Sequence, residues 1–457
     1  MPKTKHLLLV YFDYSSISYT PLDIACVLAY LQKNVSNLKI TVLPVCADRR
    51  KKLGEYKKDV YQIQGFKPDA VIFFLDNILW SGMFYEGLAM QLAKQLKQLS
   101  PDLKIGFQSY KIRAERSAEE LKKNSRIDFI LRGEPEIPFL DFCSKSDYRK
   151  MRGITYRRGK QVVVNKDAPL IKNLDTIPSP YLTGMLDSFI TNKLANFKRK
   201  SFFLTASRGC PYRCHYCFRS VKFSAVRNFS PQRVVAEIRY LYEKGVKEII
   251  FLDDTFIGFG KCFTEFLKEY GKVFSDKKSP VVFVMTRPEL LTPLAIKNLS
   301  QINVKYIQIG IQTLNPDAQY LMGRPTDFTP KVFEEIARNC KRAGIKLHYD
   351  CVFGLPGDTL ADFQKTVEFA VSLQPWRIQI KQLYLNPDTL FEVNAKDYGI
   401  KSGRILPRNV PFVKSSNGWK PAGINQAFEF AIATQKKNPK IRFKIVSEYG
   451  YFNNFNS

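Results

Sequence analysis

The sequence predicts an α/β protein with an N-terminal doubly wound, Rossmann-like domain, a partial (β/α)6 barrel and a small C-terminal extension. Short apolar strands alternate with amphipathic helices in two series, and the second series has too few units for a complete eight-unit barrel. The composition agrees, because 45% apolar and 13% aromatic residues in a chain of 457 support large buried cores. We place the domains at residues 1–145, 201–390 and 391–457, with a connector over 146–200.

The first series predicts a parallel sheet covered by helices on both faces. Ligands of such sheets bind beyond the carboxyl ends of the strands. A proline-rich turn in the connector, Ile177–Tyr181, is expected to be extended because each proline fixes its own φ and restricts the residue before it. The expected strands are Leu7–Phe12, Ile40–Val45, Ala70–Leu75, Lys104–Phe107 and Asp128–Leu131, and the expected helices are Pro21–Leu31, Met83–Leu99 and Ala114–Lys122.

The second series predicts the partial barrel. Ser230-Pro231 and Thr329-Pro330 are typical helix starts, and Gly245 and Gly344 end the same two helices. The expected strands are Phe202–Ala206, Glu248–Leu252, Val281–Met285, Tyr306–Ile311, Lys346–Phe353 and Arg377–Tyr384, and the extension holds one helix (Ile424–Gln435) and one strand (Arg442–Val446).

The charge balance is strongly basic. Lysine and arginine number 71 against 42 acidic residues, a formal net charge of +29 that suits an acidic partner such as a nucleic acid, an anionic membrane or an acidic peptide. No apolar run approaches the roughly 20 residues that span a bilayer. The run Leu7–Phe12 is shorter than the apolar region of a signal peptide, so we expect a buried first strand, a cytoplasmic protein and no membrane partner.

Three of the nine cysteines, Cys210, Cys214 and Cys217, form a C-x3-C-x2-C motif. Three thiolates on one loop can bind three irons of a 4Fe–4S cluster and leave the fourth iron open. Zinc is the alternative, but it would need a fourth ligand, and His215 lies in a cramped position between two of the cysteines. The surrounding Gly, Pro, Tyr and Arg residues argue against an accidental cluster of core cysteines.

This motif, placed just after the first barrel strand, resembles that of the radical S-adenosylmethionine (SAM) superfamily, whose signature is C-x3-C-x-aromatic-C. Tyr216 stands at the aromatic position. The resemblance implies a 4Fe–4S cluster held by Cys210, Cys214 and Cys217, with SAM bound to the open iron. One electron from the cluster would cleave SAM to methionine and a 5′-deoxyadenosyl radical, and Tyr216 would help to place the adenine.

Further residues match the superfamily in the expected order along residues 201–384. Asp253 and Asp254 follow the second strand, where the resemblance implies contact with the methionine ammonium; a solvated helix N-cap is the alternative. Gln312 lies on the polar face of the fourth strand, and Arg324 could meet the methionine carboxylate or be an ordinary surface arginine. Gly354 begins a G-x-P-G turn after the fifth strand.

The N-terminal domain resembles the cobalamin-binding domain that precedes the barrel in many radical SAM enzymes. The similarity rests on Thr20–Ala25 in the opening helix, an R-G-E-x-E turn at Arg132–Glu136, and residues 178–184 of the connector. A glycine-rich loop expected after the fourth strand is replaced by Gly106-Phe107-Gln108-Ser109-Tyr110, and no D-x-H-x-x-G motif is present. Bulky side chains there oppose close backbone approach, so these departures weigh against cobalamin as a cofactor.

Two reactions follow from the resemblance. We rank first the epimerisation of peptidyl α-carbons from L to D in a ribosomally made, proteusin-type precursor peptide, and second a cobalamin-dependent C-methylation of a peptide or other natural product. RNA modification is third. An epimerase needs a thiol to return a hydrogen; Cys351 and Cys262 are the candidates, although alternation along the fifth strand turns Cys351 away from the lumen unless a bulge intervenes. Three other cysteines, Cys26, Cys143 and Cys340, lie on apolar helix faces and are expected in the core.

The implied partners are a precursor peptide with an acidic leader, which would fit the basic chain, and an electron donor such as flavodoxin or ferredoxin. A nucleic acid is not expected, because the last 60 or so residues show no sign of the RNA-binding barrel that methylthio-transferring relatives carry.

Overall fold

The computed structural model divides the chain into two compact units, Met1–Lys198 with Leu406–Asn409 and Arg199–Ile405 with Val410–Ser457. Each unit has its own sheet and its own core, and each is described by itself. The described residues are 6–13, 21–46, 56–75, 83–191, 201–219, 225–256, 261–275, 279–324, 328–405 and 410–453. Thr20, the first residue of the opening-helix motif, lies outside them.

The first unit contains a sheet in the order β2-β1-β3-β4-β5-β6-β7. Its first five strands are parallel, and their order is that of the flavodoxin-like fold, in which the strand order reverses between β1 and β3. An antiparallel hairpin, β6–β7, continues the sheet beyond residue 145, where the sequence placed the start of the connector. The strands are β1 (His6–Asp13), β2 (Lys39–Cys46), β3 (Ala70–Phe74), β4 (Lys104–Ser109), β5 (Phe129–Arg132), β6 (Ile154–Arg158) and β7 (Gln161–Val164).

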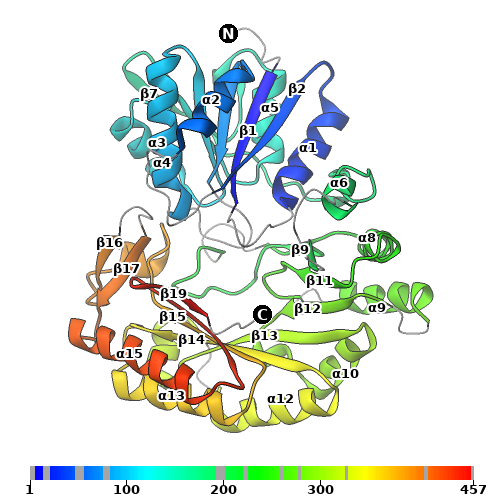
Figure 1. Ribbon diagram of the computed structural model, residues 1–457, viewed down its shortest axis with the longest axis vertical. Helices are drawn as coiled ribbons and strands as arrows, with labels where there is room; N and C mark the ends of the chain where they lie inside the picture. Colours follow the sequence, from blue (N-terminus) through cyan, green and yellow to red (C-terminus); the bar gives the residue numbers. More distant parts are fainter. Residues whose placement is uncertain are drawn as a thin grey trace. The chain divides into compact units, whose positions relative to one another are not determined.

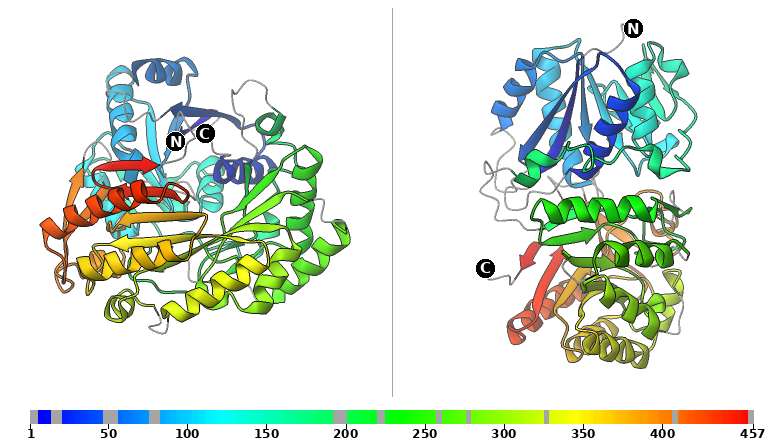
Figure 2. Two further views of the ribbon diagram at one scale, coloured as in Figure 1. Left: turned by 60° about the horizontal axis from the view of Figure 1, so that its bottom comes forward. Right: turned by 90° about the vertical axis from the view of Figure 1, so that its right-hand side faces the viewer.

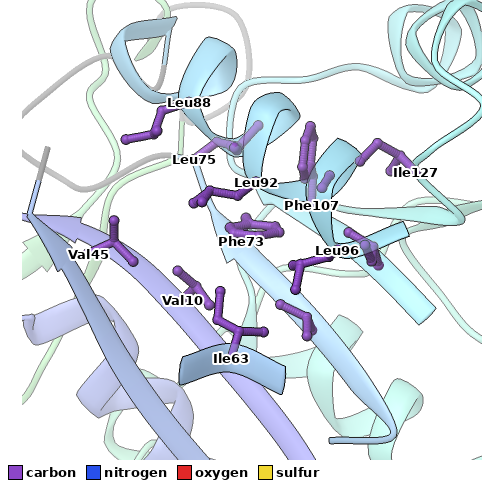
Figure 3. Packing of buried hydrophobic residues seen from close by; sticks show 14 of the residues in the cluster. Val10, Val45, Ile63, Phe73, Leu75, Leu88, Leu92, Leu96, Phe107 and Ile127 are labelled. Carbon is purple, nitrogen blue, oxygen red and sulfur yellow. The ribbon is translucent and has the colours of Figure 1, made fainter. Parts of the chain in front are cut away.

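Helices cover both faces of this sheet (Figure 1), as a doubly wound fold requires. Alternate residues of each strand enter two separate cores: Val10 and Phe73 pack under α2, α3 and α4 (Figure 3), whereas Leu9 and Phe129 pack under α1 and α5. Phe107 belongs to the first core, where its ring meets that of Phe73 edge-on. The helices are α1 (Leu22–Asn34), α2 (Lys57–Gly65), α3 (Met83–Leu99), α4 (Ala114–Lys123), α5 (Glu136–Ser144) and the short α6 (Asp187–Thr191).

Arg132, which begins the R-G-E-x-E turn, fastens the hairpin to the parallel sheet. Its guanidinium is 1% exposed and donates to the Thr155 hydroxyl, the Asn165 carbonyl oxygen and the Asp167 carboxylate. These acceptors lie on or just after β6 and β7, so the turn residue holds the end of β5 against the hairpin. Gly133 follows in the left-handed region at φ +79°, with open space around its Cα.

The second unit contains one curved sheet in the order β19-β18-β15-β14-β13-β12-β11-β8. The six strands from β8 to β15 are parallel neighbours in chain order, as the partial barrel predicts. The strands are β8 (Ser201–Leu204), β11 (Glu248–Phe251), β12 (Val281–Met285), β13 (Val304–Gln312), β14 (Lys346–Phe353), β15 (Arg377–Gln382), β18 (Arg442–Ser447) and β19 (Gly450–Asn453).

The strand expected in the C-terminal extension, β18, is a seventh parallel strand of the barrel sheet, paired with β15. Helix α15 (Pro421–Lys437) lies between these strands in the chain and packs on α13 and β18, so it forms the crossover that a parallel pair needs. The antiparallel strand β19 ends the sheet. A hairpin of β16 (Lys401–Ile405) and β17 (Val410–Ser415) follows the short helix α14 (Leu390–Val393).

Helices lie outside the curved sheet (Figure 2). Its inner face carries polar side chains such as Gln308, Asp350 and Gln379. Phe333 of α12 contacts Tyr349 of β14, and Phe363 of α13 contacts Phe353 further along the same strand. No helix among the described residues has the length and apolarity to cross a membrane. The barrel helices are α8 (Pro231–Glu243), α9 (Lys261–Val273), α10 (Pro293–Gln301), α11 (Pro316–Leu321), α12 (Pro330–Arg342) and α13 (Leu360–Ser372).

A close contact in the first unit gives a test of its packing. A Cβ added at Gly106 of β4 would lie 2.1 Å from the Phe129 ring, while one added at Gly65, at the end of α2, would meet nothing within 4 Å. We expect Gly106→Ala to lower the free energy of unfolding by about 1–3 kcal/mol through overpacking, and Gly65→Ala to be neutral or stabilising. Urea denaturation measures both, and equal stabilities for the two variants would contradict this packing.

Candidate active site

The three cysteines lie on the segment that joins β8 to α8, at the carboxyl end of the first barrel strand. A short antiparallel ribbon of β9 (Ser207–Arg208) and β10 (Arg227–Asn228) brings the two sides of this segment together. Gly209 then adopts φ +100°, a conformation that glycine accepts without strain, immediately before Cys210. The ribbon and the glycine together start the cysteine loop.

The three cysteines are half-buried and are not joined in disulfides. The Sγ of Cys210 lies 3.8 Å from the Thr255 hydroxyl, and the backbone NH of Cys217 donates to the Cys214 carbonyl oxygen at 3.0 Å. Desolvation raises the pKa of Cys217 to about 12 and also raises the pKa of Cys210.

The donor set fits a cluster better than zinc. A single zinc ion draws four ligands to within roughly 2.0–2.3 Å of one point, whereas each cysteine of a 4Fe–4S cluster binds a different iron. Among the described residues, no three His, Cys, Asp or Glu side chains gather closely enough to hold one metal ion. Three thiols on one loop suit a cluster with an open iron, whereas zinc would need a fourth ligand beside them.

His215, the fourth ligand of the zinc alternative, instead anchors the loop. Its Nδ1 lies 2.8 Å from the Leu321 carbonyl oxygen, and its backbone NH donates to the Met322 carbonyl oxygen at 3.0 Å. Its own carbonyl oxygen accepts from the backbone NH of Phe391. The ring lies directly over Gly323, where an added Cβ would come within 2.8 Å of it. The loop is thereby held against the end of α11 and the start of α14.

The carboxylates of Asp253 and Asp254 fasten the two ends of the cysteine loop. Asp253 is 1% exposed and accepts from the Ala206 backbone NH at 2.9 Å and from the Ser207 hydroxyl, just before the loop. Asp254 forms an ion pair of 3.0 Å with Arg219, just after it. Burial raises the pKa of Asp253 to about 7, and burial also raises the pKa of Asp254. Asp253 and Asp254, whose carboxylates were expected to face the methionine ammonium, therefore hold the cysteine loop in place.

Tyr216 packs on an apolar cluster at the carboxyl ends of β14 and β15. Its carbonyl oxygen accepts from the side-chain amide of Asn386 at 3.0 Å, and the other amide atom of Asn386, Oδ1, is buried with no hydrogen-bond partner among the described residues. Burial raises the pKa of Tyr216, so its phenol is neutral. The residue expected beside the adenine is therefore fixed by its main chain and its ring.

Gln312 and Arg324 come together at the end of β13. Arg324 is 8% exposed and donates from Nη1 to the Gly310 carbonyl oxygen at 3.1 Å, while the Gln312 amide covers the Cα of Gly310. Gln312 adopts φ +64° where the pairing of β13 with β14 shifts register. The Nε of Arg324 is buried without a hydrogen-bond partner in the described part of the chain, so it can donate to a ligand such as a carboxylate.

Gly354 lies at the end of β14, beyond the last strand residue, at φ +85°. Its carbonyl oxygen accepts from the Ser416 hydroxyl at 3.1 Å, and its Cα faces Ile424 of α15. The structure therefore places this predicted binding residue against the C-terminal helix and hairpin.

An arginine that the sequence analysis did not single out contacts the cysteine loop. Arg287, directly after β12, donates from Nη1 to the Sγ of Cys214 at 3.3 Å and lies 3.8 Å from the centre of the Tyr212 ring. Its Nε pairs with Glu289. Burial opposes its charge, but Cys214 and Glu289 outweigh burial and raise the pKa of the guanidinium.

The inner face of the sheet carries a polar network centred on Asp350 of β14. Gln308 of β13 and Gln379 of β15 donate to its two oxygens at 2.8 and 2.9 Å, and the Lys381 ammonium lies at 3.4 Å. Burial alone would raise the pKa of Asp350, but Lys381 and the Gln308 hydrogen bond outweigh it and hold this pKa below its usual value. His348, on the same face, is neutral because burial lowers its pKa to about 3.

Cys351 does not face this network. It is 0% exposed and lies on the helix-facing side of β14 with Tyr349 and Phe353. The pairing of β14 with β15 runs without interruption from His348 to Phe353. The register shift opposite Cys351 has its extra residue in β13, so β14 itself carries no bulge that turns the thiol toward the lumen. Burial raises the pKa of this thiol, as it does for a core cysteine. This placement argues against the predicted role of Cys351 as a hydrogen donor at the barrel mouth.

Cys262, the second candidate thiol, is half-buried at the start of α9. The Asn228 side-chain amide donates to its Sγ at 3.3 Å, which ties it to the β9–β10 ribbon. Cys26, Cys143 and Cys340 are buried, as predicted for core residues.

In the first unit, the carboxyl ends of β4 and β5 offer polar and small groups. The Gln108 amide is 0% exposed and donates to the Gly133 carbonyl oxygen at 3.2 Å, while its Oε1 has no hydrogen-bond partner among the described residues. Phe107 points into the core, so of the two aromatic residues expected to block a cofactor only Tyr110 lies at this edge. An unsatisfied amide oxygen beside an open glycine fits a cofactor with amide groups, such as cobalamin.

Comparison with known proteins identifies the barrel. Residues 204–370 match the model of the radical SAM superfamily. The barrel of this chain is a radical SAM domain. Its family uses a 4Fe–4S cluster and SAM, in agreement with the donor set on the cysteine loop.

Curated relatives include two methyltransferases. An uncharacterized methyltransferase of Pyrococcus horikoshii is 28% identical over 259 residues, which are 54% of this chain and 53% of that protein. The cobalamin-dependent radical SAM methyltransferase TokK of Streptomyces tokunonensis is 27% identical over 173 residues, 36% of this chain and 25% of that protein. The matched segments thus span about half or less of these relatives.

The similarity to solved structures extends over both units. The radical SAM methyltransferase TsrM of Kitasatospora setae, solved with tryptophan and a SAM analogue, aligns with a TM-score of 0.71 at 16% identity, covering 94% of this chain and 89% of that chain. At this identity the likeness establishes the fold.

Three contributors to the site escaped the sequence analysis: Arg287, Asn386 and Asp350. Arg287 and Asn386 follow the third and sixth barrel strands, at the carboxyl edge where ligands of such sheets bind, so their position was a usable signal. Asp350 belongs to the polar face that alternation assigned to the lumen, but its partners come from two other strands, and pairing register is not readable from one sequence.

The contact between His215 and Gly323 gives a test of the radical SAM loop. Gly323 and Gly344 share φ +69°, but only at Gly323 would a Cβ meet the His215 ring. We expect Gly323→Ala to lose most of its iron after anaerobic reconstitution, because the loop must move, and Gly344→Ala to retain it. Both variants carry the left-handed penalty of about 1–2 kcal/mol, so equal iron per chain in the two would contradict this anchoring role.

The Asp350 network gives a pH test of the radical SAM barrel. We expect Asp350→Asn to lower the free energy of unfolding at pH 7 by about 3 kcal/mol, because it leaves Lys381 without its counter-charge. The folded-state pKa of Asp350 is depressed, so its contribution exists above the unfolded value of about 3.9 and is lost as pH falls through the folded value. Denaturation at several pH values should show the difference shrinking in acid. Asp397→Asn, at an exposed site, is the control, and a constant difference would refute the charge argument.

Proposed function

We propose that the protein is a cobalamin-dependent radical SAM methyltransferase that methylates a carbon of a peptide or other natural product. One observation carries this proposal: a 2-1-3-4-5 parallel sheet and a radical SAM barrel occur in one chain, and TsrM, a methyltransferase, shares this fold over 94% of the chain. The relatives named as methyltransferases support the same reaction. This was the second of the two reactions that the sequence indicated.

Epimerisation, the reaction ranked first from the sequence, has less support. It needs a thiol that can return a hydrogen to the substrate, and Cys351 is sealed on the helix side of β14. Cys262 is engaged with Asn228 beside the cysteine loop. The inner face of β14 and β15 presents Asp350, Gln379 and Lys381, groups that bind and orient a polar substrate but do not donate hydrogen atoms.

Residues of the barrel unit would bind the cluster and SAM, and residues of the first unit would bind cobalamin. Cys210, Cys214 and Cys217 would hold the 4Fe–4S cluster, which when bound with SAM supplies one-electron cleavage of the sulfonium. Arg324, with its unpartnered Nε, and Gln312 would bind the methionine part of SAM.

Tyr216 would bound the adenine. In the first unit, Gln108 would donate to or accept from a cobalamin amide, and Gly133 would allow close backbone approach. A peptide with an acidic segment remains the proposed substrate class, and a flavodoxin or ferredoxin the proposed electron donor.

A direct experiment separates the two reactions. The anaerobically reconstituted protein is loaded with hydroxocobalamin, reduced, and incubated with methyl-labelled SAM and candidate peptides in deuterated water. We expect cobalamin to stay bound through gel filtration, label to appear on cobalamin, and any product to gain the mass of a methylene group. Deuterium at α-carbons without methyl gain, in protein that retains no cobalamin, would overturn the proposal in favour of epimerisation. Gln108→Leu is expected to weaken cobalamin retention, and Gln379→Leu, in the other unit, to leave it unchanged.

A further inference from the structure

We propose that Arg287 is a positioning residue of the iron–sulfur centre, whose hydrogen bond to the Cys214 sulfur raises the reduction potential of the cluster. The inference rests on the proposed cluster and adds a role for a residue outside the cysteine motif. It concerns the step that precedes all chemistry on SAM, namely entry of the electron.

The contact is direct. The Nη1 of Arg287 donates to the Cys214 Sγ at 3.3 Å, and the guanidinium carbon lies 3.8 Å from the centre of the Tyr212 ring, two residues before that cysteine. Arg287 therefore touches the cysteine loop at a sulfur and at an aromatic face. The side chain is only 8% exposed, so water screens these interactions weakly.

The surrounding chain fixes the arginine in this pose. Thr286 still belongs to the sheet, since its NH donates to the Gln308 carbonyl oxygen at 3.0 Å. Pro288 then begins a short 3-10 helix, Pro288–Leu290, in which the Leu290 NH donates to the Arg287 carbonyl oxygen. Glu289 holds the Nε from the other side. The backbone of Arg287 and the Nε of its side chain are thus already restrained where Nη1 contacts the Cys214 sulfur.

Reduction explains what such an arginine does. An external reductant loses one electron and the cluster gains it; no bond to Arg287 forms or breaks, and its protons stay on nitrogen. The gained electron increases the negative charge on the cluster and its thiolates, so a donor N–H at one of them stabilises the reduced state more than the oxidised state. Hydrogen bonds to the sulfurs and local charge are known determinants of cluster potentials.

The Glu289 carboxylate does not cancel this effect. It neutralises much of the net charge of the pair at long range, yet the N–H that faces Cys214 remains a short-range donor to sulfur. The prediction is therefore specific to the hydrogen bond, and removal of another positive charge from the same loop should matter less. Arg213 provides that comparison, because it lies on the loop between Tyr212 and Cys214 and is exposed.

The test is an anaerobic redox titration with dithionite, followed by electron paramagnetic resonance of the reduced cluster. Arg287→Gln removes the charge and the planar guanidinium, Arg287→Lys keeps the charge, and Arg213→Gln is the matched control. We expect Arg287→Gln to lower the equilibrium constant for reduction about tenfold, which for a one-electron couple is a shift of 59 mV to more negative potential. Arg287→Lys should shift less, and Arg213→Gln should stay within about threefold of the unmodified protein.

Iron and sulfide per chain, measured on every sample, separate the outcomes. A fully loaded Arg287→Gln protein with an unchanged potential would overturn the role of Arg287 and leave the proposed function intact. An unmodified protein that takes up no cluster would overturn the proposed function itself. If Arg287→Gln loads poorly, the fully loaded Arg287→Lys protein decides: an unshifted potential in a protein that has lost the exchangeable-proton coupling in pulsed double resonance would refute the role of the hydrogen bond.

Discussion

The fastening of one short loop is the constraint on which the rest of this molecule depends. Asp253 and Asp254, adjacent at the end of β11, hold residues before and after the three cysteines, and His215 ties the middle of the loop to the end of α11. Buried carboxylates are costly to desolvate, so the barrel satisfies Asp253 with a backbone NH and a hydroxyl, and Asp254 with Arg219. Barrel residues therefore hold the loop near its start, in its middle and near its end.

The alternation of side chains along the strands determines which groups face the inner side of the sheet, where a substrate of the cysteine loop would bind. Residues of β14 divide strictly into a helix side, which contains Cys351, and an inner side, which contains Asp350. Around Asp350 the neighbouring strands β13 and β15 place the amides of Gln308 and Gln379 and the Lys381 ammonium, whereas the thiol of β14, Cys351, lies on the other side of the strand. This division is the structural reason for preferring a reaction in which the substrate radical is completed by a transferred group over one in which it is completed by hydrogen from a cysteine.

Much of the fold could be predicted from the sequence, because apolar periodicity and proline or glycine at helix ends are local signals. The cluster ligands could also be predicted, because the C-x3-C-x2-C spacing of the cysteines itself indicates an iron–sulfur site. The hairpin β6–β7 was missed because its strands are only five and four residues long and do not continue the strand–helix alternation. Strand β18 was assigned to an extension because its pairing with β15 depends on contacts distant in the chain. The position of Arg287 after a barrel strand was a usable signal, but its contact with Cys214 could not be predicted for the same reason: the two residues lie 73 positions apart in the chain.

The proposed chemistry requires a 4Fe–4S cluster with one iron left open for SAM. Mössbauer spectroscopy of anaerobically reconstituted, iron-57-labelled protein, recorded with and without SAM, examines this most directly. We expect four irons per chain in a cubane signal, with one iron site altered when SAM is added. A cubane signal indifferent to SAM, or a protein that binds zinc in place of iron on Cys210, Cys214 and Cys217, would contradict it.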